Sequence, residues 1–288
     1  MPDNAAPVTR SVRVNDIALT YYEWRAKPGN QEPPLVIAHA TGFHGRCYSA
    51  IAELFPDRRV IAIDLRGHGR SEGGPVDTWR TISDDLVGLL DQLRIKRAVG
   101  FGHSMGAHVS LQAASERPDA YSRLVLFDPV ILPPEFYQGP AVSEVPHPTI
   151  RRKRDFATVE AMMERFRTRE PYSLFTQRVF EDYCRYGLTQ RKGGDHVLAC
   201  TPEMEASVYS SSRSNAAIFD AAKAVDIPVT VVRAQQTGAG DFKGSPTWPG
   251  LADILPQGTD MYRPDRTHFH PFEDPGDAAR IIAEAEGA

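Results

Sequence analysis

The sequence predicts an α/β fold with a mostly parallel central sheet flanked by helices. Short continuous apolar runs recur at residues 35–38, 60–63, 98–101, 124–127 and 229–232. Such runs are typical of strands that are buried on both faces. The segments between most of them are long enough for crossover helices, which gives the βαβ alternation of a helix-covered parallel sheet. With 288 residues, 41% of them hydrophobic, the chain can bury a large core and is neither disordered nor fibrous.

Further elements are expected before, within and after this series of apolar runs. Residues 9–24 alternate like a strand, and Asn15-Asp16 marks a turn, so two antiparallel strands should open the fold. Residues 83–93 place four leucines on one helical face, with two aspartates in the predicted first turn. A last strand is expected around residues 261–262, followed by a helix over residues 277–286.

The regular alternation stops after residue 129 and resumes about a hundred residues later. Between these points, apolar residues such as Phe156, Val159 and Met163 recur at helical spacing among prolines and charges. We therefore expect residues 133–215 to form a mainly helical insertion in a core made of residues 1–132 and 216–288. Basic clusters within residues 151–169 are interspersed with acids, which favours a solvated face over an anion site.

Composition narrows the classes of partner. A formal net charge of -4 provides no basic field for a nucleic acid. The chain has no basic head followed by an apolar stretch and no run of ~18 apolar residues, so we expect no membrane span and a cytoplasmic location. Cys47, Cys184 and Cys200 lack metal-ligand spacing, so we expect reduced structural thiols, no metal and no cofactor. The oligomeric state is not indicated.

Residues 102–106 read Gly-His-Ser-Met-Gly and directly follow an apolar run. This pentapeptide is a weak signal alone, but a strand before it and a helix after it are the setting of a nucleophile elbow. Gly102 and Gly106 provide the space for that sharp turn. The sequence therefore predicts Ser104 as a nucleophile. The backbone N–H of Met105, at the helix start, should point towards the substrate oxygen.

Three segments together resemble the α/β-hydrolase superfamily: HATGF at residues 39–43, IDLRGHGRS at residues 63–71, and GHSMG. The resemblance runs from about residue 35 to residue 268. It implies the α/β-hydrolase fold, with residues 133–215 as an inserted helical cap. It also implies a second oxyanion-hole N–H from Thr41, with Gly42 as the alternative because Ala40 replaces the frequent glycine. His39 and His68 then correspond to structural loop residues.

A serine hydroxyl needs a base, and the base needs an orienting group. His268 lies in RTHFHPFEDP, which resembles the family's GHF segment with Thr267 where glycine is usual. His268 is therefore the predicted base, and His270 is the alternative. His103 adjoins the serine, but we expect it to pack inside the elbow.

The acid has two candidates. The family usually carries it just after the seventh strand, where residues 234–237 contain no carboxylate. Asp241 lies 27 positions before His268, a similar interval to the usual one, and Ser245-Pro246 after it fits the common pattern. This assignment requires residues 238–240 to bulge as an insertion. Asp128 is the alternative, because some members carry the acid after the sixth strand. The sequence favours Asp241 and leaves Asp128 open.

These residues predict acyl transfer through an acyl-enzyme intermediate. The resemblance suggests a carboxylic ester as substrate, and the Met and Phe residues of the insertion suit a small molecule with an apolar acyl group. A lactonase or thioesterase, a carbon–carbon bond hydrolase or lyase, and a slow-turnover ligand receptor remain alternatives.

Overall fold

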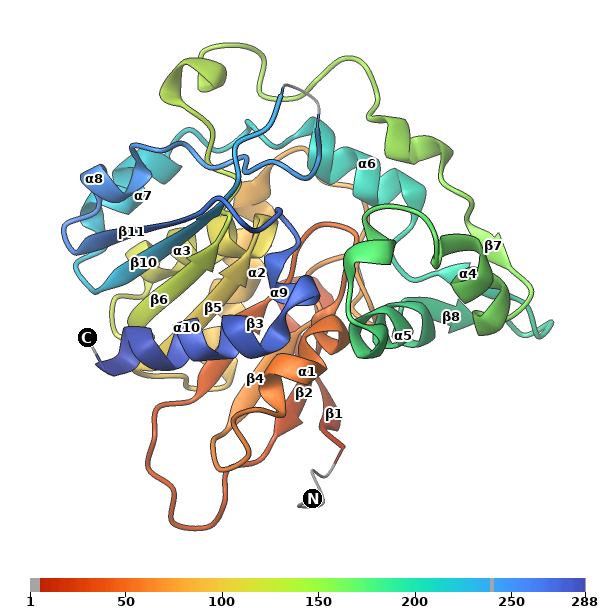
Figure 1. Ribbon diagram of the computed structural model, residues 1–288, viewed down its shortest axis with the longest axis horizontal. Coiled ribbons are helices and arrows are strands. Elements are labelled where there is room, and N and C mark those ends of the chain that lie inside the picture. The colour runs from red at the N-terminus through yellow and green to blue at the C-terminus, as the bar shows by residue number, and fades with distance from the viewer. Residues whose placement is uncertain (1–5, 239–240, 288) are drawn as a thin grey trace.

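An eight-stranded sheet forms the centre of the computed structural model, which describes residues 6–238 and 241–287 (Figure 1). Its strand order is β1-β2-β4-β3-β5-β6-β10-β11. The β1·β2 and β2·β4 pairs are antiparallel and the remaining pairs are parallel. The strands are β1 (Val8–Val14), β2 (Ile17–Trp24), β3 (Leu35–Ala38), β4 (Val60–Ile63), β5 (Ala98–His103), β6 (Tyr121–Phe127), β10 (Val229–Ala234) and β11 (Gly258–Arg263). All five apolar runs are therefore strands.

Helices cover both faces of the sheet. One buried cluster joins the sheet to α2 (Trp79–Gln92), α3 (Met105–Glu116), α7 (Ile218–Ala224) and α8 (Leu251–Ile254). A second joins the opposite face to α1 (Ser49–Ala52), α9 (His270–Glu273) and α10 (Pro275–Gly287). Burial of the central strands on both sides explains why β3, β4 and the ends of β5 and β6 are continuously apolar, whereas the edge strand β1 alternates.

Helix α2 begins four residues earlier than expected. The side chain of Thr78 accepts a hydrogen bond from the N–H of Arg80 at 3.2 Å and caps the helix there. The prediction that Asp84 and Asp85 lie in the first turn was therefore wrong. Asp85 is fully buried, and its carboxylate binds Arg66 in the loop after β4.

The chain between β6 and β10 contains three helices of two turns or more, α4 (Val159–Phe166), α5 (Gln177–Tyr186) and α6 (Pro202–Ser210). It also contains a small antiparallel sheet of β7 (Asp155–Phe156), β9 (His196–Leu198) and β8 (Leu188–Gln190). The sequence did not predict this sheet, because strands of two or three residues show no measurable periodicity.

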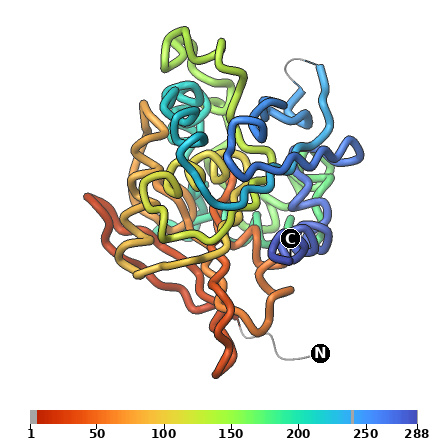
Figure 2. Tube along the Cα trace, turned by 90° about the vertical axis from the view of Figure 1, so that its left-hand side faces the viewer, coloured from red at the N-terminus to blue at the C-terminus, as the bar shows by residue number. Residues whose placement is uncertain are grey.

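Two segments that are distant in sequence frame one end of the molecule. Figures 1 and 2, which view it from perpendicular directions, both place residues 133–150 and the described part of the loop 237–250 at this end. Parallel strands β5 and β6 finish at one edge of the sheet, so the residues that follow them lie close together. This edge is where ligands bind in open parallel sheets.

Two features bear on the expectations from composition. Within the residues that the structure describes, no helix has both the length and the apolar character needed to cross a membrane. Cys47, Cys184 and Cys200 are buried free thiols. Burial raises the pKa of the Cys47 thiol well above its ordinary value, which keeps it protonated.

Candidate active site

Ser104 lies in the sharp turn between β5 and α3. Its backbone has φ 57° and ψ -117°, a region that non-glycine residues rarely adopt. The turn is tight because a Cβ at Gly102 would overlap the backbone of Ala107, and one at Gly106 would overlap the backbone of Ala38. The strand-turn-helix setting expected around residues 102–106 is therefore present, and the strained backbone holds the serine side chain at the sheet edge.

A continuous hydrogen-bonded chain joins Ser104, His268 and Asp128. The Nε2 atom of His268 lies 3.1 Å from Ser104 Oγ, and its Nδ1 atom lies 3.2 Å from Asp128 Oδ2. A carboxylate only accepts, so Nδ1 carries the proton of the neutral ring and Nε2 is free to accept from the serine hydroxyl. This is the geometry that a serine nucleophile, a histidine base and an orienting acid would require.

Three hydrogen bonds fix Asp128, two on its carboxylate and one on its backbone N–H. Its Oδ1 atom accepts hydrogen bonds from the backbone N–H of Ala234 at 2.9 Å and from the Ser245 hydroxyl at 2.5 Å. Its own N–H donates to the carbonyl of Val232 at 2.8 Å. These contacts leave Oδ2 for His268. Asp128 also has a positive φ of 46°, so its side-chain direction is set by an unusual backbone conformation.

Asp241, which the sequence favoured as the acid, lies in an exposed turn of the loop after β10. Its Oδ1 atom accepts from the backbone N–H of Lys243 at 2.9 Å. The structure thus brings Asp128, and not Asp241, to His268. The 27-residue spacing between Asp241 and His268 was misleading because a spacing in sequence does not show where the folded chain places the side chain. Of the bulge expected at residues 238–240, residues 239 and 240 lie outside the described part of the chain.

The backbone of His268 is fixed by two neighbours. Its N–H donates to the carbonyl of Lys243 at 2.8 Å, and its carbonyl accepts from Nε2 of His103, also at 2.8 Å. The other nitrogen of His103 accepts from the Tyr48 hydroxyl, which in turn accepts from the N–H of Ala40. Burial lowers the pKa of His103 well below its ordinary value, so the ring stays neutral. His103 thus packs inside the elbow, as expected, and connects it to the loops of Ala40 and His268.

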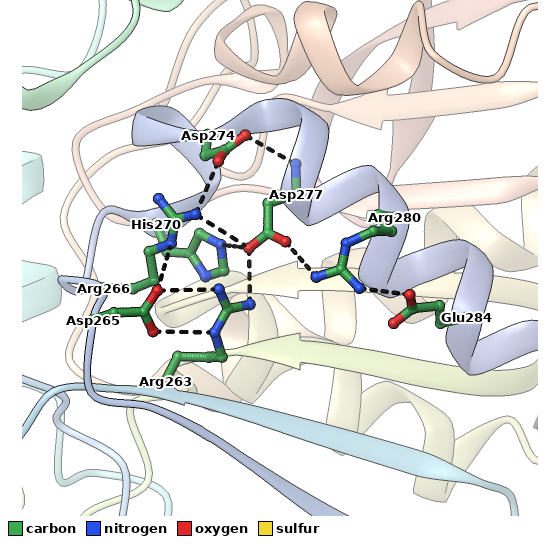
Figure 3. Close-up of polar contacts among 8 residues, drawn as sticks. All are labelled: Arg263, Asp265, Arg266, His270, Asp274, Asp277, Arg280 and Glu284. Carbon is green, nitrogen blue, oxygen red and sulfur yellow. Dashed lines mark hydrogen bonds and ion pairs between the residues drawn. The ribbon is translucent and has the colours of Figure 1, made fainter.

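His270, the alternative base, is paired with an acid of α10 and has no hydrogen bond to Ser104 among the described residues. Its Nε2 atom lies 2.7 Å from Asp277, which also binds Arg263 and Arg280 (Figure 3). Burial lowers the pKa of His270, and its hydrogen bond to Asp277 opposes this shift only in part. The ion-pair network connects the loop of His268 to α10 and provides His270 with a structural partner.

Two buried histidines position the loop that follows β3. Nδ1 of His68 donates to the carbonyl of Arg66 at 2.8 Å, so its Nε2 accepts from the N–H of Gly42 at 3.1 Å. Burial lowers the pKa of His68 to about 4. His39 likewise contacts the carbonyl of Ala40 and the N–H of Leu65. Both therefore act as the loop-orienting residues that the resemblance implied.

The backbone N–H groups of Thr41 and Met105 are the candidates for an oxyanion hole. Because the N–H of Gly42 already donates to His68, Gly42 is the weaker of the two alternatives for this loop. Among the described residues, no hydrogen-bond acceptor contacts the N–H of Thr41 or of Met105. Thr41 lines the same cavity as Ser104. Met105 begins α3, so its N–H lies at the positive end of the helix dipole.

An ion pair from the inserted segment packs on this loop. The guanidinium of Arg152 binds the carboxylate of Glu205 and donates to the hydroxyls of Tyr172 and Tyr183 at 3.0 and 2.7 Å. A Cβ at Gly42 would lie 2.9 Å from the Glu205 carboxylate oxygen, so the pair contacts the loop directly. The expectation of a fully solvated basic cluster was thus wrong at Arg152, because periodicity does not reveal a buried charge partner 53 residues away.

Beside the triad lies a cavity of about 640 Å³, within the range typical of small-molecule sites. Ser104, His268 and Thr41 contribute to its wall. Most of the other lining side chains are apolar, among them Trp79, Val130, Leu132, Phe136, Phe242 and Phe269. No group of three or more His, Cys, Asp or Glu side chains suited to a metal ion occurs within residues 6–238 and 241–287.

The sequence matches the alpha/beta hydrolase family over residues 35–281, and the chain belongs to that family. It is 37% identical over 117 residues to the sn-1-specific diacylglycerol lipase ABHD11 of Danio rerio, covering 39% of this chain and 36% of the relative. It is also 37% identical over 111 residues to the uncharacterized hydrolase YugF of Bacillus subtilis strain 168, covering 37% of this chain and 39% of the relative. These matches thus span under half the length of either relative.

Solved structures show the same fold. An E-2-(acetamidomethylene)succinate hydrolase aligns with a TM-score of 0.72 at 20% identity, covering 98% of this chain and 100% of that protein. The peroxisomal alpha-beta-hydrolase Lpx1 of Saccharomyces cerevisiae aligns with a TM-score of 0.74 at 16% identity, covering 98% and 88%. The prediction of an α/β-hydrolase fold is confirmed, and the chain is a hydrolase by family.

Proposed function

We propose that this hydrolase cleaves carboxylic esters of small molecules, with Ser104 as nucleophile, His268 as general base and Asp128 as the orienting acid. The observation that carries the proposal is the Ser104–His268–Asp128 chain at the wall of a 640 Å³ apolar cavity. Two of the curated relatives have names that support it, the diacylglycerol lipase of Danio rerio and the monoglyceride lipase of Rattus norvegicus.

The reaction follows from the geometry. Ser104 Oγ attacks the ester carbonyl carbon while its proton passes to Nε2 of His268, and Asp128 stabilises the imidazolium that forms. The carbonyl oxygen becomes an oxyanion, which accepts from the N–H groups of Met105 and Thr41. Collapse of the intermediate breaks the ester bond, and His268 returns the proton to the departing alcohol. Water, deprotonated by His268, then attacks the acyl-enzyme and releases the acid.

Residues 133–215 act in this proposal as a cap that shapes the substrate cavity. Phe136 and Tyr209 from this segment line the cavity. An apolar acyl group placed against such side chains gains the free energy of removing its surface from water, about 25 cal/mol per Å². We therefore expect an apolar acyl group rather than a short polar one.

Steady-state hydrolysis of p-nitrophenyl butyrate and hexanoate tests the proposal, with γ-lactones and acyl thioesters as competing substrates. We expect the p-nitrophenyl esters to give the highest kcat/KM, and Ser104→Ala to lower it at least about 10³-fold. A higher kcat/KM on lactones or thioesters would replace the ester assignment. Full activity in Ser104→Ala would contradict the nucleophile.

A further inference from the structure

Few ionisable side chains line the cavity beside Ser104, and none of those described is a Lys or Arg. Among the described residues that line it, the ionisable side chains are His268, Tyr209 and Asp241. His268 belongs to the triad. The pKa of Tyr209 is raised by burial, so the phenol stays neutral. Asp241 therefore provides the fixed charge of this wall outside the triad, and that charge is negative.

Two basic side chains that lie close to lining residues, Lys243 and Arg152, are each paired with a carboxylate. Lys243, two residues after Asp241, places its Nζ atom 3.1 Å from the carboxylate of Glu170. Arg152, a half-buried cation within residues 133–215, is bound by Glu205 and two tyrosine hydroxyls. Neither Lys243 nor Arg152 lines the cavity. A substrate anion inside the cavity would therefore meet no cation of the described lining.

The loop holds Asp241 at the rim by contacts to its backbone and side chain. Its N–H donates to the carbonyl of Gly238 at 3.1 Å, and its Oδ1 accepts from the N–H of Lys243 at 2.9 Å. The next residue, Phe242, is half-exposed and lies edge-on to Phe269 at 6.1 Å between ring centroids. The carboxylate thus sits beside an apolar aromatic wall.

These features select against negative charge in two ways. An anionic group that enters this mostly apolar wall loses hydration and meets no Lys or Arg side chain of the described lining, and neutral donors such as Ser212, Gln236 and Thr247 offset only part of that loss. It also meets the field of Asp241, whose repulsion is moderate because water reaches that side chain. An uncharged group of the same shape suffers neither effect.

We propose that the cavity selects uncharged esters over esters with a carboxylate on the acyl chain, and that Asp241 is a specificity-determining residue for this selection. The inference rests on the proposed ester hydrolysis. It gives Asp241 a role at the rim of the cavity that differs from the triad acid favoured by the sequence.

A matched substrate pair tests it. Mono-p-nitrophenyl adipate carries a terminal carboxylate, and its methyl ester has the same chain without the charge. For the wild-type protein we expect kcat/KM to be at least about 100-fold higher for the methyl ester. Asp241→Asn should lower the ratio of the two kcat/KM values about 5- to 10-fold. Added salt should also lower this ratio in the wild-type protein, and should lower it less in Asp241→Asn. Asp220→Asn, an exposed carboxylate on α7, is the control and should leave the ratio unchanged.

The outcomes separate the two proposals. A wild-type ratio below about threefold, or the same ratio in Asp241→Asn as in the wild type, would overturn the charge selection while ester hydrolysis stands. If neither ester is hydrolysed, the proposed function fails, and the charge selection is then decided by calorimetric binding of both compounds to Ser104→Ala. Tighter binding of the methyl ester, with a gap that narrows in Ser104→Ala/Asp241→Asn, supports the selection. Equal binding overturns it.

Discussion

The parallel sheet and the inserted segment contribute different things to the same site. Ser104 and Asp128 follow adjacent strands, and His268 follows β11, so the three residues of the proposed triad lie after the C-terminal ends of strands. The segment 133–215 contributes cavity wall at Phe136 and an ion pair that contacts Gly42. In the proposed mechanism the sheet therefore positions the reacting groups, whereas residues 133–215 shape part of the cavity and contact the loop of Gly42.

The largest effect on kcat should come from substitution of Asp128, which follows β6. Asp128→Asn leaves the shape of the side chain but favours the wrong tautomer of His268, so we expect kcat to fall about 10⁴-fold. Asp241→Asn, at the exposed rim, should lower kcat on p-nitrophenyl butyrate less than tenfold. Stopped-flow and steady-state assays of both variants check this. Equal losses in the two variants would contradict the assignment of Asp128.

The buried ion pair of the segment should matter next. Glu205 is buried and Arg152 is half-buried, so Glu205→Gln, which removes the charge opposite Arg152, should lower the free energy of unfolding by about 3 kcal/mol. Because the pair contacts Gly42, kcat should also fall several-fold. Glu203→Gln, on the same helix but exposed, should cost less than about 0.5 kcal/mol. Urea titrations measure both, and similar losses in the two variants would show that the pair does not support the loop.

Acid should destabilise the loop held by His68. Its folded-state pKa of about 4 lies below the ordinary 6.5, so the unfolded chain binds more protons between these values. Stability therefore rises with pH through this window and is lost as pH falls from 6.5 towards 4. Between pH 7 and pH 5 this one group should cost at most about 2 kcal/mol.

His68→Gln cannot titrate, so its free energy of unfolding should fall less between pH 7 and pH 5 than that of the wild type. His196→Gln, at a half-buried position outside the core, is the control and should follow the wild type. Parallel urea titrations at both pH values make the comparison. A His68→Gln curve parallel to the wild-type curve would refute the role of this histidine.

The smallest effect is expected at the mouth of the cavity. Phe136 is 49% exposed and comes from the inserted segment, so Phe136→Ala should raise KM for p-nitrophenyl octanoate about threefold and change kcat little. Leu54→Ala removes an equally exposed side chain that does not line the cavity. A larger effect on kcat than on KM would contradict a role of Phe136 in substrate binding alone.

The sequence predicted the sheet and the sharp turn at Ser104 well because both leave local signals. Strands buried on two faces are apolar throughout, and the elbow needs glycine on both sides of Ser104. The acid left no such signal. Asp128 is selected by contacts from Ala234 and Ser245, which lie over a hundred residues away in sequence and are brought together only by the fold.

Contacts across the fold were likewise hidden in the inserted segment. The partners of Arg152 come from α5, α6 and the loop before α5, and no spacing in a single sequence connects them. The short strands β7, β8 and β9 are too brief for a periodic pattern. Helical spacing was visible within residues 133–215. It indicated neither the small sheet of β7, β9 and β8 nor the pairing of Arg152 with Glu205.

The most direct test of the central claim is labelling of the native protein by a fluorophosphonate, followed by peptide mass spectrometry. We predict one adduct, on Ser104, formed at least about 100-fold more slowly in Asp128→Asn and absent in Ser104→Ala. Labelling of Ser104→Ala at the wild-type rate, or no labelling of the wild-type protein, would contradict a Ser104–His268–Asp128 nucleophile.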